Sequence, residues 1–321
     1  MDQRTSPPNT RQRLSVLKSL LRPLHIVDVV NISFYSFLSI LSIVFHSRVP
    51  EWYWIVLVNT VGTALVYTIS YLSRNRVEKV VYLRLVYSII TIAVVFKELY
   101  LLVHPIHPTD YDQSLIAIDY FLFGVHPTRW IYQFAHPLIT EILQIVYTSF
   151  YLLPVLLGIE LVKRKDYKTF EETLFIFVYG FYLSYIGYFL VPAVGPRFTL
   201  HDFHAISQEL PGLWLTNTLR EIVNIGESIP SGTASPMNYV QRDVFPSGHT
   251  DITLIVMYLA AKYHSKIRWL LWTIGTLLII ATVYLRYHYV IDLIAGALFM
   301  LLTVKSAPIL SHLWKRWVSR A

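Results

Sequence analysis

The chain has 321 residues, of which 55% are hydrophobic and only 15% are charged, and its mean hydropathy is positive. Because a soluble domain carries about 25% charged residues, this composition indicates a membrane protein and excludes an ordinary soluble domain. The absence of cysteine excludes disulfides and thiolate metal sites. The net charge of +7 does not indicate a nucleic-acid partner, because most of the basic residues fall on segments that are predicted to lie on one side of the membrane.

Apolar runs of about the length of a membrane span follow a basic segment, residues 1–22, that is predicted to be a cytoplasmic tail. These runs fall near residues 26–46, 52–72, 82–103, 138–160, 172–192, 249–263, 269–286 and 288–306. The sequence therefore predicts an all-α, polytopic helical bundle of about eight spans, in which the last two spans form a hairpin.

The charges between the runs give an independent check on this topology. With the N-terminus inside, 20 of the 27 Lys and Arg residues fall on cytoplasmic segments, and 13 of the 20 acidic residues fall on the other side. Such a bias follows the positive-inside rule, and a span count wrong by one would scramble it. Both termini are therefore predicted to be cytoplasmic.

Two non-cytoplasmic segments are long. In residues 104–137, apolar residues recur at helical spacing among Asp112, Asp119, His126 and His136. This pattern predicts amphipathic helices at the membrane interface. The four polar side chains would either face water or line a pocket for a lipid headgroup. Residues 193–246 are polar and rich in turn-forming residues. No internal repeat divides the chain, so we expect one membrane domain.

The stretch "YLRYHYVIDLIAGA" places His288 and Asp292 on one face of a helix. An ionisable residue inside a span is costly and needs a partner. A carboxylate beside an imidazole fixes its tautomer and leaves the other ring nitrogen free to attack or to take a proton. The alternative is a structural pair in which the two side chains only satisfy each other.

The stretch "FPSGHT" places Ser247, Gly248 and His249 where an apolar helix begins. Unpaired N–H groups and the positive end of the helix dipole favour an anion there, and His249 could donate a proton into the same site. An ordinary serine cap followed by an interfacial histidine is the alternative.

The stretch "VPAVGPRF" ends a span and places Arg197 on the same side of the membrane. A guanidinium binds phosphate oxygens with two parallel hydrogen bonds, although an interfacial arginine can also simply extend toward water. Arg286, two residues before His288, is a second candidate cation.

Together these residues predict a phosphoryl-transfer site. His288, oriented by Asp292, would attack phosphorus, and His249 would protonate the leaving oxygen. Four groups would hold the remaining oxygens, namely Arg197, Arg286, Ser247 and the N–H of Gly248. A metal site is not expected, because only two histidines converge and no carboxylate cage accompanies them, and no cofactor is expected either.

The pairing of "PSGH" with "HYVID" resembles the type 2 phosphatidic acid phosphatase superfamily, and "GPRF" and "HYVIDLIAG" are most similar to its branch related to inositol phosphorylceramide synthases. The resemblance spans roughly residues 80–305 and implies a six-helix core with a phosphohistidine mechanism. It implies that His288 is the nucleophile, Asp292 its orienting residue and His249 the acid and base. Residues 23–79 would be two additional helices, 80–306 the catalytic core and 307–321 a basic cytoplasmic C-terminus.

The sequence departs from the superfamily at two places. Leu190 stands where a lysine precedes the arginine of the first motif, and Ala281 and Thr282 stand where a Ser-Arg pair precedes the nucleophile. Arg286 or Lys97 could supply the missing cation. The resemblance therefore leaves the full set of phosphate ligands open.

We therefore expect an enzyme that acts on a membrane lipid phosphate or diphosphate at the non-cytoplasmic surface, most simply as a phosphatase in a bacterial inner membrane. A lipid phosphotransferase of the inositol phosphorylceramide synthase type is the alternative, because the chemistry of His288 is the same in both. A transporter with a His/Asp relay is a remote alternative, because it would call for inverted repeats and broken helices at the midplane.

Overall fold

The structure, a computed structural model, describes residues 21–73 and 77–319, so the predicted tail over residues 1–22 lies almost wholly outside the described part. Every regular element in the described residues is a helix, which confirms the predicted all-α class. The α-helices are α2 (Ile26–Val44), α3 (Trp52–Ser73), α4 (Val77–Ile106), α5 (Asp112–Phe123), α6 (Pro127–Trp130), α7 (Pro137–Thr148), α8 (Leu152–Lys163), α9 (Tyr167–Leu190), α10 (Pro196–Thr199), α11 (Ile206–Glu209), α12 (Thr216–Gly226), α13 (Gly248–Lys262), α14 (Arg268–Tyr284) and α15 (Val290–Ser319). Three short 3₁₀ helices cover Ile131–Phe134, Phe203–Ala205 and Pro236–Asn238.

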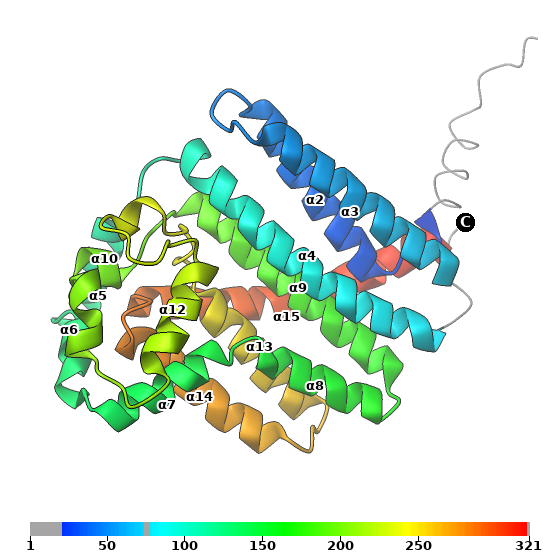
Figure 1. The fold of residues 1–321 in the computed structure, drawn as a ribbon. Coiled ribbons are helices and arrows are strands. Elements are labelled where there is room, and N and C mark those ends of the chain that lie inside the picture. Colours follow the sequence, from blue (N-terminus) through cyan, green and yellow to red (C-terminus); the bar gives the residue numbers. More distant parts are fainter. Residues whose placement is uncertain (1–20, 74–76, 320–321) are drawn as a thin grey trace, which may run out of the picture.

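The long helices run side by side, and the short helices α5, α6, α10 and α12 gather at one end of the bundle, away from the C-terminus (Figure 1). In the part of the chain that the structure describes, five helices are long and apolar enough to cross a membrane, namely α2, α3, α4, α9 and α15, and the bent pair of α7 and α8 is a sixth if it is counted as one span. The chain is thus a multi-pass membrane protein. The predicted total of eight spans stays a prediction, because α13 and α14 have only 15 and 17 residues.

The predicted run 138–160 is broken into two helices that meet at an angle of 55°. Pro154 lies in the first turn of α8, and in a continuous helix its ring would collide with the carbonyl of Phe150. The last predicted run also differs, because α15 continues past residue 306 to Ser319.

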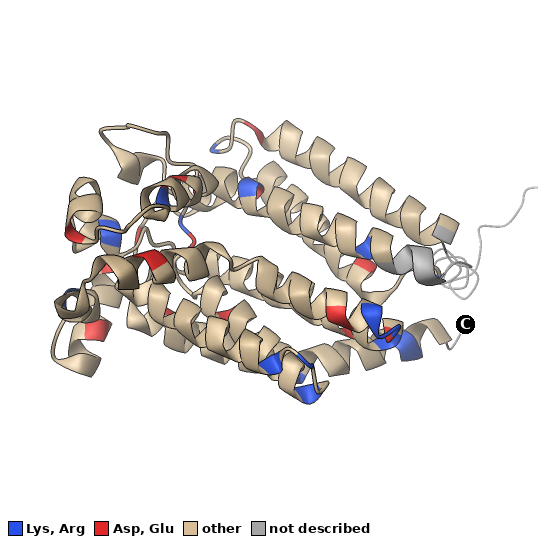
Figure 2. Ribbon diagram, turned by 60° about the horizontal axis from the view of Figure 1, so that its bottom comes forward, with Lys and Arg blue, Asp and Glu red and all other residues tan. Residues whose placement is uncertain are grey.

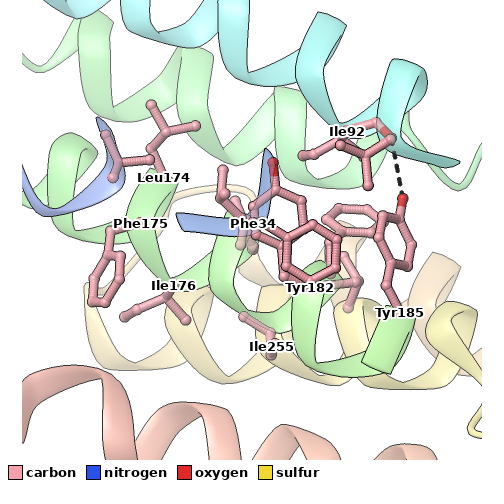
Figure 3. Packing of buried hydrophobic residues seen from close by; sticks show 14 of the residues in the cluster. Phe34, Ile92, Leu174, Phe175, Ile176, Tyr182, Tyr185 and Ile255 are labelled. Carbon is pink, nitrogen blue, oxygen red and sulfur yellow. Dashed lines mark hydrogen bonds between the residues drawn. The ribbon is translucent and has the colours of Figure 1, made fainter. Parts of the chain in front are cut away.

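Helix α9 lies at the centre of the bundle and contacts α2, α4, α8, α13 and α15. In its most apolar stretch 72% of the residues are buried, against 44% or fewer in the other four candidate spans. Tyr182 of α9 stacks on Phe34 at 4.1 Å between ring centroids, and the hydroxyl of Tyr185 donates to the carbonyl of Ile92 at 3.3 Å (Figure 3). Aromatic rings with bonded hydroxyls thus form much of the core.

A buried polar cluster joins four helices at the other end of the bundle. Asp28 of α2 accepts hydrogen bonds from Ser70 of α3 at 2.7 Å, from Arg84 of α4 at 3.2 Å and from Tyr87 of α4. Arg84 also pairs with Glu171 of α9. Lys and Arg are concentrated toward this end, which also carries the C-terminus (Figure 2).

The helices α13 and α15 approach closely where α13 begins. A Cβ atom at Gly296 of α15 would lie 2.6 Å from the carbonyl oxygen of Ser247 and 3.1 Å from the Cβ of Thr250. The N–H of Ser247 in turn donates to the carbonyl of Asp292 at 3.0 Å. Only a glycine permits this approach, which fixes the start of α13 against the start of α15.

Gly296→Ala is therefore expected to destabilise the protein by about 1–3 kcal/mol, because the added methyl group meets backbone that cannot move aside. Thermal unfolding in detergent, followed by tryptophan fluorescence, would show a midpoint several degrees lower. Gly226→Ala is the matched control, since nothing lies within 4 Å of its Cβ position. Equal midpoints for the two variants would contradict this packing.

Candidate active site

The three sequence clusters meet at a small cavity of about 40 Å³ at the end of the bundle where α13 begins. Its titratable lining residues include Arg197, Glu227, Asp243, His249 and His288, and five tyrosines, three phenylalanines and two valines form much of the rest of the wall. Gly248 also lines it. The segments that carry these groups are far apart in the sequence, so the fold brings the predicted residues together.

His288 lies in the connection between α14 and α15 and is buried. Its Nδ1 atom is 3.0 Å from the carbonyl oxygen of Val244 and 3.4 Å from Oδ2 of Asp292. Because both neighbours are acceptors, Nδ1 carries the proton and Nε2 keeps its lone pair. Burial, reinforced by the nearby His249, lowers the pKa of His288, so the imidazole is neutral at neutral pH.

Asp292 lies in the first turn of α15 and is fully buried. Its Oδ2 atom accepts the N–H of Tyr289 at 2.8 Å, so the carboxylate both caps the helix and faces the imidazole of His288. The sequence predicted the His288–Asp292 pair, but it gave no sign that Val244 would supply the shorter contact.

His249 lies in the first turn of α13, between aromatic rings. It stacks on Tyr147 at 4.6 Å between ring centroids, lies 4.4 Å from the ring of Phe150 and meets His288 edge to face at 5.7 Å. Within the described residues neither ring nitrogen of His249 forms a hydrogen bond, so both are available to a ligand in the cavity.

Ser247 and Gly248 have different positions. The hydroxyl oxygen of Ser247 caps α13 by accepting the N–H of Thr250 at 3.2 Å and its hydroxyl at 3.1 Å, and the side chain does not line the cavity. Gly248 does line it, and a Cβ atom there would lie 2.5 Å from the hydroxyl of Tyr188. The structure thus brings the backbone of Gly248, but not the hydroxyl of Ser247, to the site.

Arg197 reaches the cavity from α10. The turn before it needs glycine, because Gly195 has φ of +96° and a Cβ atom there would lie 2.9 Å from the carbonyl of Tyr287. The guanidinium donates to Oδ1 of Asn224 at 3.1 Å and pairs with Glu227, while its Nε has no partner in the described part of the chain.

The structure does not bring Arg286 to the cavity with the others. Its guanidinium pairs with Glu209 of α11 and lies over the ring of Tyr132 at 5.3 Å. Lys97, the other substitute cation, lines a neighbouring cavity, where its ammonium group donates to the carbonyl of Gly226 at 2.6 Å and to the hydroxyl of Ser228 at 3.0 Å.

Two buried carboxylates of α5, outside the cavity, bind the backbone segments that carry the site residues. Asp112 accepts the N–H groups of Val194 at 3.0 Å and Gly195 at 2.8 Å, and the hydroxyl of Tyr289 at 2.7 Å. Asp119 accepts the N–H groups of Val290 and Ile291, both at 2.8 Å, at the start of α15. These residues bind backbone and do not line the cavity. Their spacing of seven residues, two turns of one helix face, is the only sequence signal for this role.

A second cavity of about 530 Å³ adjoins the first and is predominantly apolar. It lies between α4, α7, α8, α9 and α12, and Asp243, Glu227 and His249 line both cavities. Asp243 and Glu227 were not among the residues predicted from the sequence to form the site. In the described residues no group of three or more His, Cys, Asp or Glu is placed to hold a metal ion.

Comparison with models of known families matches residues 113–305 to the PAP2 superfamily, the type 2 phosphatidic acid phosphatases that the motifs resemble. The matched residues run from α5 through about half of α15 and include the predicted site residues Arg197, Ser247, Gly248, His249, Arg286, His288 and Asp292. Neither a curated protein nor a solved structure matches the chain.

Asp112→Ala is expected to lower the thermal unfolding midpoint in detergent by several degrees. It leaves the buried N–H groups of Val194 and Gly195 without an acceptor, each costing about 1–3 kcal/mol, and it removes one of the two partners of the Tyr289 hydroxyl, the other being the hydroxyl of Thr199. Asp202→Ala, which removes an exposed carboxylate that caps a single N–H on the same side, is the control. A shift no larger than that of the control would contradict the role of Asp112.

Proposed function

Because the chain belongs to the PAP2 superfamily, we propose that it is an integral membrane enzyme that cleaves the phosphate ester of a lipid through a phosphohistidine at His288. The observation that carries the proposal is the shared cavity: a neutral imidazole, a second histidine and a guanidinium line it together, and it adjoins a large apolar cavity. The membership in the branch of inositol phosphorylceramide synthases remains a prediction.

In the first step, Nε2 of His288 attacks phosphorus and the bond from phosphorus to the lipid oxygen breaks. His249, in its protonated form, gives its proton to the departing oxygen. The contacts of Nδ1 with Val244 and Asp292 stabilise the positive charge that the ring acquires. Arg197 and the N-terminal turn of α13 at Gly248 hold the oxygens of the phosphoryl group.

In the second step, the oxygen of water attacks the phosphorus of the phosphohistidine. Its proton passes to His249, and the bond between Nε2 and phosphorus breaks. The products are the free lipid alcohol and a phosphate, and both histidines return to their starting protonation states. Hydrolysis of this kind makes the enzyme a lipid-phosphate phosphatase.

The large cavity supports a lipid substrate. Half of its lining residues are Leu, Ile, Val or Phe, most of them from α4 and α9, and His249 lines it as well. An acyl chain fits such a surface while the phosphate lies in the small cavity. The concentration of Lys and Arg toward the opposite end of the bundle supports the part of the proposal that puts the site on the non-cytoplasmic side, in a bacterial inner membrane as the sequence suggested.

A lipid phosphotransferase is the second candidate. His249, the residue that would accept a proton from the attacking group, also lines the large cavity. The hydroxyl of a lipid alcohol lying in that cavity would reach the same place as water. The first step is then unchanged, and only the acceptor of the phosphoryl group differs.

The test is an assay of the purified protein in detergent with a panel of lipid phosphates and diphosphates, with and without an alcohol acceptor. His288→Ala is expected to reduce release of the lipid alcohol by at least about a thousandfold, because no other described group in the cavity replaces the nucleophile. His204→Ala, an exposed histidine on the same side, is the matched control. Undiminished release in His288→Ala, or no release from any lipid by the unmodified protein, would refute the proposal.

Arg197→Lys is expected to lower kcat/KM by about 10- to 100-fold, because an ammonium group cannot reproduce the planar fork of donors. Arg286→Lys, outside the cavity, is expected to lower it by less than about threefold. Steady-state kinetics of both variants on the best lipid of the panel makes the comparison. If Arg286→Lys lowers kcat/KM as much as Arg197→Lys or more, Arg286 contributes to phosphate binding and its exclusion from the site is wrong.

A further inference from the structure

Arg197 brings few free hydrogen-bond donors to the small cavity. A phosphoryl group in transfer carries negative charge on three peripheral oxygens, and these oxygens need donors around them. Two of the three guanidinium nitrogens of Arg197 already have acceptors, on Asn224 and Glu227. The hydroxyl of Ser247 is used within its own helix cap. A further donor is therefore expected in the wall of the cavity.

Tyr188 of α9 has the position of such a donor. Its side chain is buried and lines the small cavity. No other described side chain lies as near to the Cβ position of Gly248 as the hydroxyl of Tyr188, at 2.5 Å, and the N–H of Gly248 forms a hydrogen bond to this hydroxyl. Within the described residues no group accepts the proton of the hydroxyl, so that proton is available to a ligand in the cavity.

The face of α9 that carries Tyr188 is fixed against the start of α13. Ser184, Gly187 and Tyr188 share this face, because they are three and four residues apart in a helix. The hydroxyl of Ser184 donates to Oδ2 of Asp251 at 2.8 Å, and Gly187 leaves room for the ring of Pro246, which a Cβ atom would touch. These contacts hold α9 against α13, so the position of the Tyr188 hydroxyl does not depend on a bond that it donates.

The hydrogen bond from Gly248 strengthens the Tyr188 hydroxyl as a donor. Gly248 is the first residue of α13, where the positive end of the helix dipole lies. A hydroxyl that accepts a hydrogen bond donates its own proton more strongly, because each bond in a chain polarises the next. The positive end of α13 therefore reaches a phosphate oxygen through the O–H group of Tyr188.

We propose that Tyr188 is a further catalytic residue, whose hydroxyl donates a hydrogen bond to a peripheral oxygen of the phosphoryl group. The inference rests on the proposed function and adds a ligand to the same site. The proton stays on the tyrosine oxygen throughout. Because the bond is made to an oxygen that does not leave phosphorus, it acts in both the formation and the hydrolysis of the phosphohistidine at His288.

The experiment compares Tyr188→Phe with Tyr182→Phe in the full chain in detergent, on the best lipid of the panel. Both substitutions remove one buried hydroxyl from α9, but the hydroxyl of Tyr182 donates to Asn31 at 2.6 Å and Tyr182 does not line the cavity. Tyr188→Phe is expected to lower kcat/KM by at least about tenfold, because a hydrogen bond to a charged oxygen is lost. Tyr182→Phe is expected to lower the unfolding midpoint and to keep kcat/KM within about threefold.

Orthovanadate tests the contact without turnover, because its oxygens surround vanadium as those of the transferring phosphoryl group surround phosphorus. Its Kd is obtained from the rise of the unfolding midpoint with vanadate concentration. This Kd is expected to increase by at least about tenfold in Tyr188→Phe and to be unchanged in Tyr182→Phe. A purely structural hydroxyl would instead change the midpoint in the absence of vanadate.

A double substitution tests the position of the hydroxyl. Gly248→Ala places a methyl group 2.5 Å from it and should displace it, whereas the next atom of the Tyr188 ring lies 3.8 Å away. Because both single substitutions remove the same bond, the double variant should have about the kcat/KM of Tyr188→Phe alone. If Tyr188→Phe does not fold, Gly248→Ala decides alone, and an unchanged kcat/KM would overturn the inference.

Equal kcat/KM and vanadate Kd in Tyr188→Phe and the unmodified protein, or losses that multiply in the double variant, would also overturn it. His288→Ala separates the two levels of failure. Lipid alcohol release that persists in His288→Ala refutes the proposed function itself. Release that is lost in His288→Ala but kept in Tyr188→Phe refutes only the role of Tyr188. An unmodified protein that neither cleaves a lipid nor binds vanadate refutes both.

Discussion

Three hydrogen bonds to one carboxylate, that of Asp112, join the two segments on which the site depends. Its oxygens hold the N–H groups of Val194 and Gly195, just before Arg197, and the hydroxyl of Tyr289, just after His288. Inside a membrane protein these groups have no water to replace the bonds, so the carboxylate fixes the distance between the two segments. The short helix α5 thereby sets the positions of the guanidinium and the imidazole without touching the cavity.

The remaining part of the site follows from the close approach of α13 and α15. Gly296 lets the cap of α13 lie against the first turns of α15, which places His249 beside His288. The tautomer of His288 is then set by two acceptors, Val244 and Asp292, that leave Nε2 free. Positioning by backbone contacts, rather than by flexible side chains, is what a nucleophile with a fixed direction of attack requires.

The sequence predicted the parts of this arrangement that depend on local pattern. Apolar length predicted the helices, and the predicted residues His249, His288, Arg197 and Gly248 do line one cavity. The bend before Pro154 does have a local signal, the proline itself, which the length of an apolar run does not capture. What could not be predicted depends on long-range pairing. Arg286 is held by Glu209, 77 residues away, and the hydroxyl of Ser247 is used within its own helix cap. Neither pairing has a signature in the residues around it. Asp243 likewise has no such signature, because its position in the wall of the cavity depends on how the loop before α13 lies against α4, where the side chain of Gln241 donates to the carbonyl of Phe96 at 2.8 Å.

The central claim is that His288 becomes covalently bonded to phosphorus, and trapping that bond tests it most directly. His249→Ala would be mixed with p-nitrophenyl phosphate, whose leaving group departs without a proton, and quenched in alkali, where a bond between nitrogen and phosphorus survives. The first step then proceeds, while the second lacks its base and is slow. We expect a burst of about one p-nitrophenol per enzyme molecule and, by mass spectrometry, a phosphoryl group on the peptide that contains His288. A burst that leaves the group on another residue, or turnover with no modified histidine, would contradict it.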